Sequence, residues 1–210
     1  MVRAIFFDIG ETLLEETRIW ERWADKLGIP RFTFMSLYGA VIDRGMPPRE
    51  VFRILDPQTD PRDAVTQALA SGLDVDFSID DFYPDALSCL TRLRSRGMFV
   101  GLAGNQPSTI ESSLDGLPAD VCLLSSNLGV EKPSPHFFRV VQESVDIPFA
   151  EIAYVGDRLD NDIMPAKDAG MMAILIRRGP WGFLHAQLPE AVRADAVIDT
   201  LDELPDALRF

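Results

Sequence analysis

Carboxylates recur where short apolar runs of this chain end. Asp8 directly follows residues 4–7, Asp157 follows residues 152–155 after one glycine, and Asp162 comes shortly afterwards. If the runs are parallel strands, their carboxyl ends meet at one crevice. Two carboxylates about 5 Å apart repel by roughly 3 kcal/mol at an effective dielectric near 20, so such a cluster requires a cation. Oxygen ligands of this kind suit Mg²⁺, with Asp8 and Asp157 as direct ligands and Asp162 as an indirect or water-mediated one.

Two further segments bring groups that bind anions to the same edge. Lys132 lies in Glu131-Lys132-Pro133-Ser134-Pro135, where the prolines restrict the backbone and hold an ammonium near the crevice. It would neutralise Asp8 and a bound phosphate, although an ordinary surface lysine before a helix is the alternative interpretation. Gly104 and Asn105 follow the second apolar run and therefore reach the same edge. The combination suits a site that holds a divalent cation and leaves room for a bound phosphate.

These residues require a sheet that places them side by side. Apolar runs rich in β-branched or aromatic residues alternate with amphipathic, helix-length segments such as residues 83–96 and 135–145. The alternation predicts an α/β fold with a doubly wound, Rossmann-like parallel sheet whose strands are buried on both faces. The predicted strands span residues 4–7, 99–103, 121–124, 152–155, 173–176 and 196–198.

A helical module interrupts this alternation. Residues 15–80 contain helical patterns at 19–27, 32–43, 49–55 and 61–71, separated by glycine and proline breaks. The predicted division is therefore an α/β core of residues 1–14 and 81–210, with a helical insertion at 15–80. Trp20 and Trp23 lie one helical turn apart, which favours a core for the module over a stripe facing a substrate or a dimer partner.

Composition excludes several classes of partner. The net charge of −13 disfavours nucleic acid and anionic membrane surfaces, and no apolar run approaches the length of a membrane span or signal peptide. Cys89 and Cys122 lie in apolar stretches typical of buried thiols, which fits a reducing cytoplasm. We expect a cytoplasmic protein that acts on a small-molecule phosphate. The oligomeric state stays open.

The sequence resembles the haloacid dehalogenase-like (HAD) superfamily over essentially the whole chain. Four motifs carry the resemblance, and the third and fourth are specific in combination. They are Phe6-Phe7-Asp8-Ile9-Gly10-Glu11-Thr12-Leu13, Leu102-Ala103-Gly104-Asn105, Glu131-Lys132-Pro133, and Val155-Gly156-Asp157 through Asp162. The insertion is similar to the small α-helical cap of that family.

The resemblance implies a mechanism as well as a fold. Asp8 would attack phosphorus to form an aspartyl phosphate that water hydrolyses, while Lys132 and Mg²⁺ hold the charge. The implied metal site consists of Asp8, Gly10, Asp157 and Asp162, and the implied phosphate site of Gly104, Asn105 and Lys132. The cap would close over the site and select the substrate.

Two positions depart from the pattern of the family's phosphatases. Gly10 stands where a second aspartate usually protonates the leaving group, a loss of roughly 10²- to 10⁴-fold in rate. Glu11 is the nearest candidate to replace it, although a solvated glutamate is the simpler interpretation. Gly104 stands where serine or threonine is common, so one hydroxyl donor to phosphate is missing.

These departures leave room for functions besides a phosphatase. A dehalogenase of the superfamily also lacks the second aspartate, but it needs no metal and gains nothing from Asp157 and Asp162. A phosphonate-cleaving relative tolerates a small residue at Gly10 but draws a lysine from the cap, where Lys26 is the only one. A binding or regulatory protein that has lost turnover is the alternative outside enzymology.

Overall fold

The computed structural model describes residues 1–208 and separates the chain into two units. The first comprises Met1–Glu15 and Ser78–Phe210, and the second, Glu16–Phe77, interrupts it after the first strand. Each unit has buried apolar side chains of its own. The first unit carries every residue that the sequence assigns to the site.

Six parallel strands form the sheet of the first unit, in the order β3-β2-β1-β4-β5-β6, which confirms the predicted doubly wound α/β fold. β1 pairs with β2 on one side and with β4 on the other, so Phe6 lies between Gly101 and Tyr154. Chain connectivity therefore reverses direction at β1, which is where such folds bind ligands. The strands are β1 (Ala4–Phe7), β2 (Phe99–Gly104), β3 (Val121–Leu124), β4 (Ile152–Gly156), β5 (Met172–Ile176) and β6 (Ala196–Ile198).

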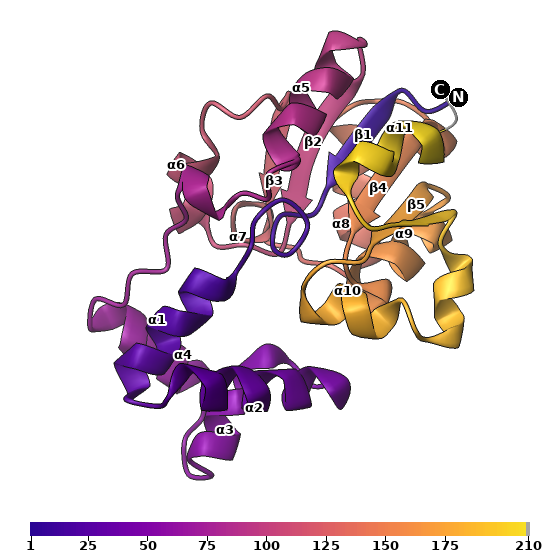
Figure 1. The fold of residues 1–210 in the computed structure, drawn as a ribbon. Coiled ribbons are helices and arrows are strands. Elements are labelled where there is room, and N and C mark those ends of the chain that lie inside the picture. The colour runs from indigo at the N-terminus through magenta and orange to yellow at the C-terminus, as the bar shows by residue number, and fades with distance from the viewer. Residues whose placement is uncertain (209–210) are drawn as a thin grey trace. The chain divides into compact units, whose positions relative to one another are not determined.

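Helices cover both faces of this sheet (Figure 1). Because strand side chains alternate, Ala4 and Phe6 join one apolar cluster with α8 and α9, while Ile5 and Phe7 point to the opposite face, where α5 packs against β2. The helices of this unit are α5 (Ala86–Ser95), α6 (Glu111–Leu114), α7 (Ser125–Leu128), α8 (Pro135–Glu143), α9 (Met164–Ala169), α10 (Gly179–His185) and α11 (Leu204–Ala207).

Two details of the prediction are wrong. Strands buried on both faces are found in the centre of the sheet, but Val197 of β6 is 48% exposed and Val121 of β3 is half-buried, because both strands lie at sheet edges. The first core helix begins at Ala86 and not at residue 83. The residues expected to form its first turn are not helical. Instead, the backbone N–H of Tyr83 donates to the carbonyl of Leu13 at 2.9 Å.

The second unit contains helices and loops, and its helices begin and end close to the predicted residues. Its helices are α1 (Thr17–Leu27), α2 (Arg31–Asp43), α3 (Val51–Leu55) and α4 (Pro61–Ala70). Gly28 ends α1 in the left-handed conformation, and the Asp60 side chain accepts the first backbone N–H groups of α4. Gly28, one of the breaks seen in the sequence, therefore acts as a helix cap, and Asp60 supplies a second cap.

Aromatic rings form the interior of this helical unit. The ring centroid of Trp23 lies 4.8 Å from that of Phe52, and the centroid of Trp20 lies 4.3 Å from that of Tyr38. Phe34 is completely buried. Both tryptophans therefore pack within the module, as expected, although they contact different partners. No helix in the part of the chain that the structure describes combines the length and apolar character of a membrane span.

Two phenylalanines on α2 test this packing. Phe34 is 0% and Phe32 84% exposed, so the pair is matched in residue type and helix. Phe34→Ala should lower the free energy of unfolding by about 3 to 5 kcal/mol, because it opens a cavity, whereas Phe32→Ala should change it by less than about 0.5 kcal/mol. Urea denaturation of both variants measures this difference. Equal losses would show that the buried side of α2 is assigned incorrectly.

Candidate active site

The carboxyl ends of β1 and β4 bring the three predicted acids together. Asp8 follows β1, Asp157 follows β4, and a π-helical turn, Leu159–Ile163, returns Asp162 towards both. One carboxylate oxygen from each acid lies within 4.8 Å of the other two, and all three side chains are buried. The arrangement follows from the reversal of connectivity at β1, which makes these two strand ends neighbours.

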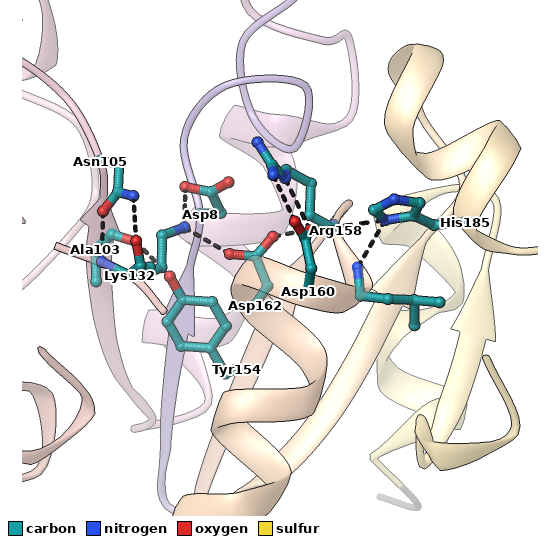
Figure 2. Close-up of polar contacts among 10 residues, drawn as sticks. Asp8, Ala103, Asn105, Lys132, Tyr154, Arg158, Asp160, Asp162 and His185 are labelled. Carbon is teal, nitrogen blue, oxygen red and sulfur yellow. Dashed lines mark hydrogen bonds and ion pairs between the residues drawn. The ribbon is translucent and has the colours of Figure 1, made fainter. Parts of the chain in front are cut away.

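Lys132 reaches into this cluster and is not a surface lysine. Its Nζ lies 2.7 Å from Oδ1 of Asp8 and 2.6 Å from Oδ1 of Asp162, and the residue is 2% exposed (Figure 2). Burial acts to lower the pKa of this ammonium, but the carboxylates of Asp162 and Asp8 outweigh it and hold the pKa well above its usual value. Lys132 is therefore a fixed positive charge against Asp8.

The side chain of Asn105 holds the backbone of Lys132. Its Nδ2 donates to the Lys132 carbonyl at 2.8 Å, and its Oδ1 accepts the Lys132 backbone N–H at 2.8 Å (Figure 2). One N–H of the amide and its oxygen are used in this way, so the second Nδ2 hydrogen and the backbone N–H of Asn105 are left for the expected contact with phosphate. The peptide bond between Lys132 and Pro133 is cis.

Gly104 is small because Asp8 occupies the space above it. A Cβ at Gly104 would lie 2.9 Å from Oδ1 of Asp8 and 3.2 Å from Cδ1 of Ile9. A serine or threonine, as the family commonly has here, could enter only if the Asp8 carboxylate moved. The orientation of the Asp8 side chain therefore accounts for the absence of a serine or threonine hydroxyl at position 104.

Asp162 and Asp157 differ in their partners. Asp162 binds Lys132 through Oδ1 and accepts the backbone N–H of Arg158 through Oδ2 at 3.0 Å, whereas the described residues provide the Asp157 carboxylate with no hydrogen bond. Burial raises the pKa of Asp162 to about 6, although Lys132 counteracts it. Burial, followed by the charges of Asp162 and Asp8, raises the pKa of Asp157 well above its usual value.

This donor set fits a hard divalent cation. Three buried carboxylates and one ammonium leave two formal negative charges, and the least satisfied carboxylate, Asp157, is 2% exposed. Oxygen donors of this kind suit Mg²⁺, and Asp8 and Asp157 are the residues that would bind it. Gly10, the remaining member of the predicted set, lies in the loop directly after Asp8 and would contribute its backbone carbonyl. Asp162 is already occupied by Lys132 and orients the cluster.

Comparisons with known proteins point to one superfamily. The sequence model of a family described as HAD-hydrolase-like matches residues 130–204. A glyceraldehyde 3-phosphate phosphatase of Methanopyrus kandleri is 28% identical over all of this chain and 98% of its own length. A phosphoglycolate phosphatase of Cupriavidus necator is 27% identical over 98% of this chain and 92% of its own. The matched family model and these relatives confirm the resemblance to the haloacid dehalogenase-like hydrolases that the sequence motifs carry.

Solved structures of HAD proteins share the fold. A HAD-superfamily hydrolase of subfamily IA, variant 1, from Geobacter sulfurreducens has a TM-score of 0.70 at 19% identity, over 99% of this chain and 96% of that one. A dehalogenase solved as an intermediate complex has a TM-score of 0.67 at 19% identity, over 98% of this chain and 96% of that one. At these identities the likeness concerns the fold alone.

Glu11, in the first HAD motif, is engaged with the core and is not a solvated side chain. Its backbone takes a positive φ of 51°, and its Oε2 accepts the hydroxyl of Tyr83 at 2.6 Å. A Cβ at Gly179 would lie 2.6 Å from Cγ of Glu11, so that glycine makes room for the side chain. Burial, and then the Glu11 charge, raise the pKa of Tyr83 above its usual value.

A second group of residues, which the sequence did not reveal, supports the loop after Asp157. The guanidinium of Arg158 lies 3.9 Å from the ring centroid of Trp181 and pairs with Asp160 at 2.7 Å. The backbone N–H of Leu159 donates to Nδ1 of His185 at 2.9 Å (Figure 2). Trp181 and His185 come from α10, far along the chain, so no local spacing pointed to them.

The raised pKa values predict a link between pH, metal and stability. An acid whose pKa is raised by folding contributes stability at low pH that is lost as pH rises through the folded pKa, which for Asp162 is about 6. The pKa of Asp157 is raised in the same direction, by burial and by the charges of Asp162 and Asp8. In EDTA at pH 7.5, Asp157→Asn should therefore raise the free energy of unfolding, because it removes a buried carboxylate that is costly to ionise.

Thermal unfolding of wild type and variant between pH 5 and 8 measures this gain, which should shrink towards pH 5. Added Mg²⁺ should stabilise wild type but not the variant. An equal Mg²⁺ response in both proteins would exclude Asp157 as a ligand.

Proposed function

We propose that this chain is a Mg²⁺-dependent phosphatase that acts on a small phosphorylated metabolite through an aspartyl phosphate on Asp8. The observation that carries the proposal is the buried ion pair between Lys132 and Asp8, beside an Asp157 carboxylate with no hydrogen bond from the described residues. The relatives named glyceraldehyde 3-phosphate phosphatase and phosphoglycolate phosphatase support a small phosphate monoester as substrate.

The first half of the reaction uses the free oxygen of Asp8. Oδ1 is held by Lys132, which leaves Oδ2 to attack phosphorus as the bond from phosphorus to the leaving-group oxygen breaks. That oxygen then takes a proton from solvent or from an acid. Mg²⁺, when held by Asp8 and Asp157, would neutralise phosphate oxygens and favour in-line attack. Lys132 keeps one positive charge beside the reacting oxygens.

The second half needs a base. Water attacks the phosphorus of the aspartyl phosphate, the bond from phosphorus to Asp8 breaks, and inorganic phosphate leaves as one water proton is accepted. Glu11, in the loop after Asp8, is the candidate for accepting that proton, and its Oε2 is held by the hydroxyl of Tyr83 at 2.6 Å.

Gly10 then sets the substrate range. Without an acid at this position, alkyl phosphates should turn over about 10²- to 10⁴-fold more slowly than in an enzyme that has one, while acyl and aryl phosphates need little protonation. A binding or regulatory role is the alternative that this loss favours. The other departure, Gly104, weighs less, because the space beside Asp8 accounts for the glycine.

Dehalogenation and phosphonate cleavage are less compatible with these contacts. A dehalogenase gains nothing from the Asp157 and Asp162 pair, which is buried here at the cost of raised pKa values. The lysine needed for phosphonate cleavage would be Lys26, whose Nζ donates to the Ser71 carbonyl inside the helical unit at 3.3 Å.

We further propose that the helical unit is a cap of the small α-helical type that selects the substrate. Its position after the first motif and its own aromatic core support this role. The free thiols of Cys89 and Cys122 fit a reducing, cytoplasmic setting.

Asp8→Asn tests the nucleophile. With Mg²⁺ and a panel of alkyl, aryl and acyl phosphates, the variant should lose at least about 10³-fold in kcat, because an amide does not form the phosphoenzyme. Asp168→Asn, an exposed aspartate paired with Arg193, is the matched control and should keep full activity. Activity that survives Asp8→Asn would exclude the mechanism. A wild type inactive on the whole panel would favour the binding role.

Gly10→Asp tests the missing acid. Restoring a proton donor should raise turnover of alkyl phosphates by about 10²-fold and leave aryl phosphates nearly unchanged, since only the former leaving groups need a proton. Gly10→Asn, of the same size but without an acidic proton, should give no gain. A folded Gly10→Asp variant that shows no rise on alkyl phosphates would mean that another group already supplies the proton.

A further inference from the structure

Tyr154 lies directly beneath the charged cluster. It is on β4, next to β1, and is completely buried on the sheet face that α8 covers, with its ring centroid 5.4 Å from that of Phe138. The Nζ of Lys132 lies over the ring, 5.5 Å from its centroid. The hydroxyl of Tyr154 points to β2 and donates to the Ala103 carbonyl at 2.5 Å (Figure 2).

This hydrogen bond determines which groups of Tyr154 are left to interact with Lys132. The tyrosine hydroxyl has one hydrogen, which it donates to the Ala103 carbonyl. The lone pairs of the hydroxyl oxygen and the π face of the ring are therefore available to the Lys132 ammonium. Burial raises the pKa of Tyr154 well above its usual value, while the charge of Lys132 acts in the opposite direction. The ring is therefore neutral, and Lys132 rests on it while its N–H groups bind Asp8 and Asp162.

Lys132 is thus held at two points by the end of the same strand. Ala103 and Asn105 both lie at the carboxyl end of β2. Asn105 binds the backbone of Lys132, and Ala103 anchors the tyrosine on which the ammonium rests. A lysine tail has several rotatable bonds, and these two anchors restrict them without using a further charge.

We propose that Tyr154 is a positioning residue that holds the Lys132 ammonium against Asp8, so that the carboxylate presents its free oxygen to phosphorus. This inference rests on the proposed phosphatase function. A purely structural Tyr154 would act only through the stability of the core, as we expect of Phe138 in the same apolar cluster. The two residues therefore form a matched pair.

The experiment compares Tyr154→Phe with Phe138→Leu in the full chain, using p-nitrophenyl phosphate and Mg²⁺. Tyr154→Phe removes one oxygen and should lower kcat by about 10-fold or more with KM within about threefold, because a small displacement of a reacting group costs rate. Its melting temperature should fall by no more than that of Phe138→Leu. Phe138→Leu should keep kcat within about twofold despite its lower stability. Tyr154→Leu, which also removes the ring, should lower kcat further than Tyr154→Phe.

The outcomes separate this inference from the proposed function. If wild type hydrolyses the substrate and both Tyr154 variants retain its kcat, Tyr154 is structural and the inference is wrong. Loss of kcat in proportion to loss of stability across all three variants would also overturn it. If Tyr154→Phe does not fold, Tyr154→Leu decides by the same comparison. A wild type without activity overturns the inference together with the proposed function.

Discussion

Three carboxylates and one ammonium lie close together at the carboxyl ends of the strands, and several features of the fold keep them in place. Asp8, Asp157 and Asp162 are all buried, and Lys132 pairs with Asp8 and Asp162, which leaves two of the three negative charges uncompensated within the cluster. Burial of like charges raises the pKa of Asp157 and of Asp162, and each such shift works against folding at neutral pH. A fold retains a cluster of this kind when it serves chemistry, and a divalent cation would relieve it.

Several features of the fold follow from building that cluster. Strand order reverses at β1, which makes the ends of β1 and β4 neighbours. The π-helical turn after Asp157 turns Asp162 back to Lys132, and Gly156 leaves room for it, since a Cβ there would lie 2.5 Å from the Asp162 carboxylate. Local irregularities are thus concentrated around one pair of strand ends.

Much of this was predictable from the sequence, for identifiable reasons. Apolar runs followed at once by acids predicted the strands and the convergence of Asp8 with Asp157, because parallel strands end at a common edge. The part played by Asn105 was not predictable, since an amide next to a phosphate site has the same pattern whether it binds the ligand or a lysine backbone. Tyr83 and Glu11 are 72 residues apart, so their contact leaves no local signal. The exposure of β6 depended on strand order, which residue patterns alone do not give.

Anomalous diffraction from crystals grown with Mn²⁺ as a substitute for Mg²⁺ would locate the cation that this cluster is built to hold. We expect one strong peak about 2.0 to 2.3 Å from carboxylate oxygens of Asp8 and Asp157, with Asp162 still bound to Lys132. Absence of a peak at this edge under saturating metal would contradict the assignment of a metal site. So would a metal bound by Asp162 in place of Asp157.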